Sequence, residues 1–331
     1  MNDITRPVIA VDAMGGDHGP SVIVPGALDG MQATSPYSLA LYGDEARIKA
    51  ELDQLNAGDL PISVVACSQH IDMGESPASA IKNKPDSPIV RAMLDHKAGK
   101  VQAVVSAGST GAMVAGGLLL LGRLPGVDRP AIATLIPTVK GELLLLDAGA
   151  NIQCTPEHIL SFARMGVVFA REILGAENPT VGQLNIGEEP KKGTEVAVAA
   201  YQLLSASGLD FVGNVEGNTL MLGPCDVVVT DGFTGNNTLK LVEGFARFLH
   251  ALSQKPDLHD AERQAMKPIL GLLMRDFSYE VYGGAMLLGV RGIPIIAHGR
   301  SSSRAITNAV KQAWREIDID LPAKLAAAYS D

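Results

Sequence analysis

The sequence predicts an α/β fold in which helices cover both faces of a mainly parallel sheet. Short apolar segments rich in branched side chains recur along the 331 residues. Amphipathic segments with helical spacing separate many of them, and loops of Gly, Ser, Thr, Asn and Asp follow several of the apolar segments. Buried parallel strands have such continuous apolar runs, and their alternation with helices is typical of a layered α/β protein.

Each predicted strand is short, apolar and bounded by residues that favour turns. The predicted helices between them begin at a polar residue or a proline. The connection between residues 132–136 and 143–146 is too short for a parallel crossover, so at least one antiparallel hairpin is expected. The predicted strands are 8–11, 39–42, 62–65, 101–105, 132–136, 143–146, 181–186, 211–215, 227–230 and 293–297, and the predicted helices include 21–32, 44–55, 88–96, 156–174 and 194–205.

A single continuous domain is expected over residues 1–331, because no low-complexity linker or strong repeat divides the chain. Residues 239–277 depart from the alternating pattern. Apolar residues recur there at helical spacing on both sides of a break at 256–260, and Pro268 is expected to kink the second helix or end a turn. This helical hairpin suits burial in the core, a dimer interface or reversible membrane contact.

Composition and charge narrow the class of function. Hydrophobic residues make up 47% of the chain and charged residues 19%, with 35 glycines, which suits a soluble, loop-rich enzyme. The net charge of -9 disfavours general nucleic-acid binding. Cys67, Cys154 and Cys225 form no C-x-x-C pair, so neither a disulfide framework nor a zinc site is expected, and a reducing cytoplasm is the expected setting. No apolar segment has the length of a signal peptide or a membrane span.

Loops of small and polar residues follow the predicted strands at positions where a parallel sheet binds ligands. The carboxyl ends of parallel strands meet at one edge of a sheet, and ligands bind outside that edge. If the loops share an edge, they form a single active site. They span residues 12–17, 106–111, 147–151, 185–193, 230–237 and 298–302.

The loop at residues 106–111 has the strongest phosphate-binding character. Gly108 and Gly111 expose backbone N–H groups at a helix start, and Ser109 and Thr110 add hydroxyl donors. A tight strand-to-helix turn explains the glycines equally well. The chain contains no G-x-G, no G-x-x-x-x-G-K-[ST] and no G-x-S-x-G, which excludes a dinucleotide fingerprint, a P-loop and a nucleophile elbow.

Carboxylates, amides and a histidine in the other loops are further candidates, and each has a structural alternative. The carboxylates suit metal or hydroxyl contacts, or simply cap a loop or helix. The paired glycines allow a ligand to approach the backbone closely, and the histidine suits an acid or a phosphate donor. These candidates are Asp12, Gly15, Gly16, Asp17, Asp147, Asn151, Asn185, Asp231 and His298.

Two lysines and an amide complete the candidate set. Lys191 and Lys192 follow a predicted strand, where a cation suits an anionic substrate or a developing oxyanion, or forms a solvated ion pair. Asn236 stands where an amide can polarise a carbonyl or cap the next helix.

Taken in order, these loops resemble the bacterial phosphate acyltransferase family PlsX, and the resemblance runs nearly end to end. It implies a three-layer α/β/α fold related to isocitrate dehydrogenase and phosphotransacetylase, acting as a homodimer. No cofactor and no metal ion are expected. The motifs that carry the resemblance are Val11-Asp-Ala-Met-Gly-Gly-Asp-His-Gly-Pro20, Ser106-Ala-Gly-Ser-Thr-Gly-Ala112, Leu146-Asp-Ala-Gly-Ala-Asn151, Asn185-Ile-Gly-Glu-Glu189, Thr230-Asp-Gly-Phe-Thr-Gly-Asn236 and Gly283-Gly-Ala-Met-Leu-Leu-Gly289.

The resemblance also implies an activity. The family transfers a fatty acyl group from acyl-acyl-carrier protein to inorganic phosphate, which gives acyl phosphate for phospholipid synthesis. Peripheral membrane contact maps onto residues 239–277, and a membrane glycerol-3-phosphate acyltransferase is the expected downstream partner. The family's lysine matches Lys192 best, with Lys191 as the alternative, and its amide matches Asn236.

The residue chemistry is compatible with this activity, because phosphate can attack a thioester directly and no covalent nucleophile is needed. Asp12, Asp17, Asp231 and His298 are candidate proton donors to the departing thiol. Competing interpretations are a phosphotransacetylase-like enzyme that uses acyl-coenzyme A, a metal-dependent decarboxylating dehydrogenase, and a non-catalytic membrane-surface scaffold.

Overall fold

The computed structural model describes residues 6–32, 34–255, 258–276 and 283–329, and it divides into two compact units. The first unit comprises Met1–Pro130 and Tyr282–Asp331, and the second comprises Ala131–Val281. Each contains parallel strands joined through helices, which confirms the predicted α/β class. That the two units make up one domain stays a prediction.

The sheet of the first unit has the strand order β3-β2-β1-β4-β11-β10. Its neighbouring strands are parallel except for β10 and β11, which pair antiparallel. The chain moves outward from β1 through β2 to β3 and then returns to the other side of β1. Such a reversal opens a crevice at the carboxyl ends of β1 and β4. The strands are β1 (Val8–Asp12), β2 (Ser38–Gly43), β3 (Ile62–Ala66), β4 (Ala103–Ser106), β10 (Ala285–Leu288) and β11 (Pro294–Ile296).

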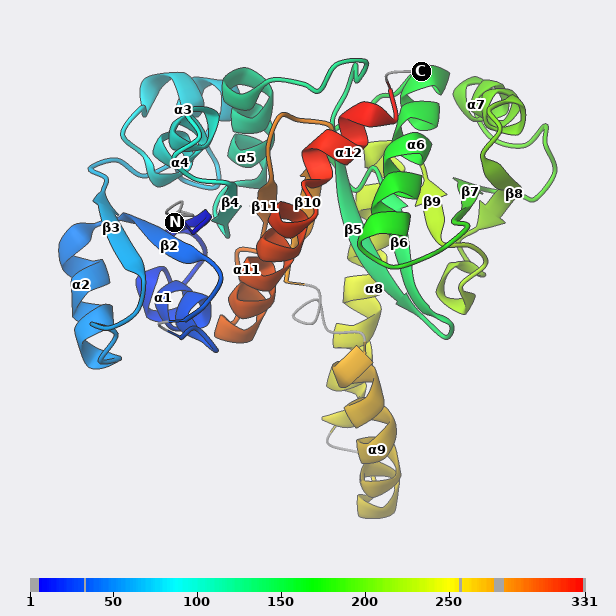
Figure 1. Cartoon of the computed structure of the whole chain (residues 1–331). Helices are drawn as coiled ribbons and strands as arrows, with labels where there is room; N and C mark the ends of the chain where they lie inside the picture. Colours follow the sequence, from blue (N-terminus) through cyan, green and yellow to red (C-terminus); the bar gives the residue numbers. More distant parts are fainter. Residues whose placement is uncertain (1–5, 33, 256–257, 277–282, 330–331) are drawn as a thin grey trace. The chain divides into compact units, whose positions relative to one another are not determined.

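Two groups of helices cover this sheet (Figure 1). α1, α2 and α11 form one group, and α3, α4 and α5 form the other. Helix α5 continues into a π-helical turn at Gly117–Leu121, and α12 (Leu321–Ala327) follows α11. The grouped helices are α1 (Pro20–Leu28), α2 (Glu45–Gln54), α3 (Pro77–Asn83), α4 (Pro88–Lys97), α5 (Thr110–Gly116) and α11 (Ser303–Asp318).

The sheet of the second unit has the strand order β5-β6-β9-β7-β8. β5 and β6 form the antiparallel hairpin that the short connection predicts, and the other neighbouring pairs are parallel. Strand β9 therefore inserts between β6 and β7, although it follows both in the sequence. The strands are β5 (Ala131–Thr138), β6 (Gly141–Leu146), β7 (Thr180–Asn185), β8 (Asp210–Glu216) and β9 (Val227–Val229).

Helices α6 (Pro156–Glu172) and α7 (Glu195–Ala206) contact each other. Helix α6 also contacts β6, β7 and β9, and α7 contacts β7 and β8. Helix α8 (Gly232–Ser253) contacts β5 and β6. A short 3-10 helix at Leu220–Leu222 packs against β5. The apolar strand residues make the core of this unit, and Leu143, Leu145 and Val228 are fully buried.

Helix α8 and helix α9 (Asp260–Asp276) form the predicted helical hairpin (Figure 1). Residues 256–257 of the predicted break and Phe277 lie outside the described residues. Helix α9 continues on both sides of Pro268. The Arg263 guanidinium donates to the carbonyl oxygens of Ser253, Lys255 and Leu258, which links the first turn of α9 to the end of α8. In the described part of the chain, no helix combines the length and apolarity needed to cross a membrane.

Candidate active site

In the first unit, the loops after β1 and β4 are joined by a buried hydrogen-bond chain. The Ser106 hydroxyl donates to Asp12 Oδ2 at 2.7 Å, and the Gly108 N–H donates to Ser106 Oγ at 3.0 Å. Burial raises the pKa of Asp12, although the Ser106 hydroxyl and nearby N–H groups oppose that change. Asp12 is only 3% exposed, so its carboxyl group positions the 106–111 loop instead of facing solvent.

Glycines allow this loop pair to pack closely against the loop after β11. A Cβ on Gly15 would lie 2.7 Å from the Gly108 nitrogen, and one on Gly16 would lie 2.9 Å from the Gly299 carbonyl oxygen. The Asp17 N–H donates to that same oxygen at 2.8 Å. The structure therefore brings together the predicted loops at 12–17, 106–111 and 298–302.

The hydroxyl groups of the 106–111 loop have different environments. Ser109 is the N-cap of α5, and its buried Oγ accepts a hydrogen bond from the Ala112 N–H at 3.3 Å. Thr110 is exposed at the first position of the helix. Thus Ser109 keeps one O–H donor while it caps the helix, and Thr110 offers its hydroxyl to solvent.

The loop after β11 contributes an imidazole and a buried hydroxyl. The Nδ1 atom of His298 accepts a hydrogen bond from the Arg300 N–H at 3.1 Å, and the Arg300 guanidinium lies 3.9 Å from the Asp17 carboxylate. The Ser301 hydroxyl is buried and has no hydrogen-bond partner among the described residues. Ser301 stands in the predicted 298–302 loop but is not among the candidate residues; its position three residues after His298 was the available signal.

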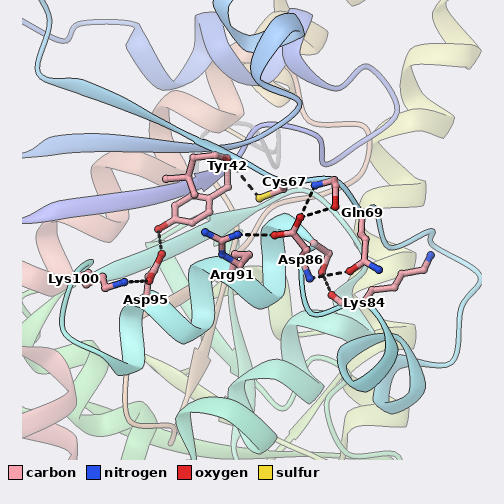
Figure 2. Close-up of polar contacts among 11 residues, drawn as sticks. Tyr42, Cys67, Gln69, Lys84, Asp86, Arg91, Asp95 and Lys100 are labelled. Carbon is pink, nitrogen blue, oxygen red and sulfur yellow. Dashed lines mark hydrogen bonds and ion pairs between the residues drawn. The ribbon is translucent and has the colours of Figure 1, made fainter.

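A polar network fixes the segment between β3 and α3, which we call the β3–α3 loop (residues 67–76), as Figure 2 shows in part. Asp86 accepts hydrogen bonds from the Ser68 hydroxyl and N–H at 2.6 and 2.9 Å, and from the Arg91 guanidinium. These donors lower the pKa of Asp86 to about 2. The Lys84 ammonium donates to the carbonyl oxygen of His70 and to Glu75, each at 2.6 Å.

The network places the β3–α3 loop beside the same site. A Cβ on Gly299 would lie 2.6 Å from the Met73 methyl carbon. This loop is not among the predicted ones, because Ser68, Gly74 and Ser76 are scattered among larger side chains and do not form a compact run of small residues; its position after a parallel strand was a clearer signal.

In the second unit, the fully buried Asp147 organises the loop after β6. Its carboxylate accepts hydrogen bonds from the N–H groups of Ile132, Gly149, Ala150 and Asn151, and from the Asn151 side-chain amide, at 2.7 to 3.1 Å. Burial raises the pKa of Asp147, although these donors oppose it. Asp147 therefore shapes the loop, and its oxygens are occupied by donors from the chain itself.

The start of α8 packs directly on this loop. The Gly232 N–H donates to the Asn151 carbonyl oxygen at 2.8 Å. Asp231 caps α8 by accepting hydrogen bonds from the Thr234 N–H and hydroxyl. Asn236 is exposed on the first turns of the helix and lies beside Gly149, whose Cβ would be 3.5 Å from the Asn236 side chain.

The loop after β7 is held by Asn185 at its base. The Asn185 amide donates to the Lys192 carbonyl oxygen at 2.9 Å, and its oxygen accepts the Ile186 N–H at 2.8 Å. The Lys192 ammonium is about half exposed and lies 3.9 Å from the Glu189 carboxylate. Of the two neighbouring lysines, Lys192 is the one whose carbonyl group Asn185 contacts; that Lys192 acts as the cation stays a prediction.

The predicted site residues thus form one set in each unit. The first set lies at the carboxyl ends of β1, β4 and β11, and the second lies at the carboxyl ends of β6, β9 and β7. Convergence of the two sets in one site stays a prediction. Within the described ranges, no three His, Cys, Asp or Glu side chains are grouped to hold a metal ion.

Comparisons with known proteins confirm the α/β fold and the family that the sequence resembles. Residues 8–324 match the family model described as fatty acid synthesis protein. A phosphate acyltransferase from Desulforamulus reducens is 48% identical over 315 residues, which cover 94% of this chain and 93% of that protein. Another from Pelotomaculum thermopropionicum is 46% identical over 316 residues, which cover 94% and 91%.

Solved structures show the same fold at low sequence identity. A phosphotransacetylase from Streptococcus pyogenes has a TM-score of 0.64 at 15% identity, with 94% of each chain covered. A phosphotransacetylase from Staphylococcus aureus has a TM-score of 0.60 at 14% identity, also with 94% of each chain covered. The family match and the curated relatives decide the class of enzyme: the chain belongs to the phosphate acyltransferases of the fatty acid synthesis protein family.

Proposed function

We propose that this acyltransferase moves a fatty acyl group from acyl-acyl-carrier protein to inorganic phosphate, giving acyl phosphate for phospholipid synthesis. The observation that carries the proposal is the 106–111 loop, which the buried Asp12 and Ser106 side chains hold at the topological switch point. Backbone N–H and hydroxyl donors fixed at a helix start suit a phosphate ion. Gly108, Ser109, Thr110 and Gly111 are the proposed phosphate contacts.

We infer that phosphate attacks the thioester directly. A phosphate oxygen bonds to the carbonyl carbon, the carbon–sulfur bond breaks, and the thiol leaves with the proton that phosphate gives up. Two of the three cysteines support this route, because burial raises the pKa of Cys67 to about 11 and that of Cys225 to about 12. Both are protonated near neutral pH and are therefore poor nucleophiles.

Lys192 and Asn236 are the proposed catalytic residues of the second set. The Lys192 ammonium neutralises charge on phosphate or on the developing oxyanion, and the Asn236 amide orients the thioester carbonyl. Both side chains are exposed at the carboxyl edge of the second unit, next to loops that Asn185 and Asp147 fix. The remaining candidates, among them Asn151, Asp17, Asp231 and His298, shape these loops or contact the substrates.

We also propose that the enzyme acts as a homodimer that touches the membrane through the α8–α9 hairpin. Leu241, Phe245, Phe248 and Leu272 on this hairpin are about half or more exposed, which supports a role in contact with an apolar partner. A membrane glycerol-3-phosphate acyltransferase that consumes acyl phosphate is the proposed downstream partner.

The test is to incubate the protein with long-chain acyl-acyl-carrier protein and phosphate, and to trap acyl phosphate with hydroxylamine. Acyl hydroxamate should form only when both substrates are present. A parallel reaction with acyl-coenzyme A identifies the preferred donor. Turnover with acyl-coenzyme A alone would contradict the carrier-protein assignment and favour a phosphotransacetylase-like reaction.

A further inference from the structure

We propose that Ile152, Ile186 and Phe233 bind the alkyl chain of the acyl donor and so determine which acyl groups the enzyme accepts. We call these three residues the apolar rim. The proposal rests on the proposed transfer of a fatty acyl group, and it adds the residues that recognise the chain itself.

The apolar rim is unusually exposed for its residue types. Ile152, Ile186 and Phe233 are 72%, 80% and 64% exposed, whereas the ends of β6 and β9, which precede Ile152 and Phe233, are made of buried aliphatic residues. Single exposed apolar side chains are common on protein surfaces, but a group of them at a ligand-binding edge indicates a contact surface.

The three residues follow three neighbouring strands at the same edge of the second unit. Leu146 of β6 is in register with Val229 of β9, and Val229 is in register with Gln183 of β7. Adjacent strands lie about 4.8 Å apart, so the outer two of these strands are separated by about 10 Å. Side chains in the loops that leave these strands therefore cover a short, continuous stretch of the edge.

Hydrogen bonds fix the backbone next to each residue of the apolar rim. The Gly232 N–H donates to the Asn151 carbonyl oxygen at 2.8 Å, so Ile152 and Phe233 each follow one partner of this bond. The Ile186 N–H donates to Asn185 Oδ1 at 2.8 Å. Each apolar side chain therefore stands next in the sequence to an anchored polar contact. The segments 185–193 and 230–237, which contain Ile186 and Phe233, also carry the proposed catalytic residues.

The chemistry of these side chains selects the occupant. None of the three carries a polar side-chain atom, so they offer nothing to the amides of a phosphopantetheine arm or to the charges of a carrier protein. The alkyl chain is the apolar part of the proposed substrate. An aliphatic chain laid across the rim removes apolar surface from water on both partners, and the gain increases with chain length.

The test compares palmitoyl and butyryl thioesters of the same carrier, using the full chain and the variants Ile186→Thr, Ile152→Thr and Phe233→Ala. We expect each substitution to lower kcat/KM for the palmitoyl thioester by about fivefold to thirtyfold, because each removes apolar surface that the chain covers. The butyryl thioester should change by less than about twofold, since it is too short to reach the whole rim. The matched control is Val139→Thr, which alters a 74% exposed residue at the β5–β6 turn of the same unit and should affect neither substrate.

Equal losses with both thioesters would overturn the proposal, as would an unchanged preference for the long chain. A change of oligomeric state with an unchanged preference would assign the rim to a second copy of the chain. Binding of a non-reactive palmitoyl thioether of the carrier, measured by calorimetry, separates this inference from the proposed reaction. If the protein makes no acyl phosphate, the proposed reaction is wrong. If the rim variants bind the thioether as tightly as the unmodified protein does, the proposal that the apolar rim binds the alkyl chain is wrong.

Discussion

At the residue scale, Lys192 is the side chain on which the proposed chemistry depends most. We expect Lys192→Ala to lower kcat/KM for acyl phosphate formation by about a hundredfold, because one preorganised electrostatic donor contributes that much to a reaction with a developing oxyanion. Hydroxylamine trapping under initial-rate conditions measures the effect. Lys191→Ala is the matched control and should stay within a few-fold of the unmodified enzyme. A near-normal rate for the Lys192 variant removes this residue from the mechanism.

Glu316 on α11 is a buried carboxyl group that is not among the candidate site residues. It is 2% exposed, and the Gln312 amide donates to its Oε1 at 2.9 Å. Burial raises the pKa of Glu316 from its ordinary 4.5 to about 8, although the Gln312 hydrogen bond opposes that change. Between these two values the folded chain holds a proton that the unfolded chain releases, so the free energy of unfolding falls as pH rises through this range.

The variant Glu316→Gln should remove that pH dependence. The amide has the shape of the protonated carboxyl group and does not ionise, so its advantage over the unmodified protein should grow from pH 5 and reach up to a few kcal/mol near pH 8. Urea unfolding at several pH values measures the difference. Glu177→Gln, at an exposed position, is the control and should leave the curve unchanged. Parallel curves for the Glu316 variant and the unmodified protein would show that this carboxyl group does not titrate across the range.

The roles of Asp147 and Asp231 show how far sequence predicts a site residue by residue. Both stand in the expected loops, but their carboxylates accept hydrogen bonds from nearby backbone N–H groups. Glycine spacing and strand ends predict where such loops lie, because the geometry of parallel strands is local. Whether a carboxylate faces a ligand or its own loop depends on how that loop folds back, and sequence alone does not determine this.

At the scale of elements, the contact between the β6–α6 loop and the start of α8 depends on Gly235. A Cβ on Gly235 would overlap the Asp147 carbonyl oxygen, so α8 packs against this loop only without a side chain there. We expect Gly235→Ala to lower the free energy of unfolding by about 2–3 kcal/mol, because the loop backbone or the helix must shift to make room for the added methyl group. The same substitution should reduce turnover.

Gly244→Ala supplies the control within the same helix. A Cβ on Gly244 meets nothing within 4 Å, so the substitution should raise the free energy of unfolding by up to about 1 kcal/mol through helix propensity alone. Equilibrium unfolding in urea measures both variants. If the two glycine variants have the same stability, the close packing at Gly235 does not constrain the loop.

The sequence predicts best those elements whose apolar residues form a clear pattern along the chain. Each predicted strand is present, with boundaries that shift by one or two residues, because buried strands impose a continuous apolar run. Strand β10 (Ala285–Leu288) is not predicted from the pattern, because its short apolar run lies inside a segment bounded by glycines, which is one of the motifs that carry the family resemblance. Once this strand is recognised, its antiparallel pairing with β11 follows from the short connection at residues 289–293, which does not allow a parallel crossover.

At the scale of the whole molecule, the exposed face of the α8–α9 hairpin predicts binding to lipid. We expect Phe245→Glu combined with Leu272→Glu to reduce binding to anionic vesicles at least tenfold, because charged side chains oppose insertion of an apolar face. Vesicle co-sedimentation measures the effect. Leu222→Glu, at an exposed apolar position outside the hairpin, is the control. Unchanged binding by the double variant, with its fold intact, would exclude the hairpin as the membrane contact.

The boundary between the two compact units is a feature that the sequence pattern does not predict. The boundary between Pro130 and Ala131 falls at the start of β5 and has no linker composition, so the pattern of strands and helices continues across it. The alternation therefore predicts the α/β class, whereas the units are defined by contacts between segments far apart in the chain.

The position of β9 in the second unit has a consequence for how the protein is made. This strand lies between β6 and β7, yet the ribosome produces it only after β7, α7 and β8 are complete. Until then, β6 and β7 lack the neighbour that joins them, and their edges stay open to wrong partners. The loops that carry Asn236, Lys192 and the apolar rim gain their final neighbours in the same step. A nascent chain that stops before β9 has therefore neither a continuous sheet in this unit nor the complete edge that carries the proposed catalytic residues.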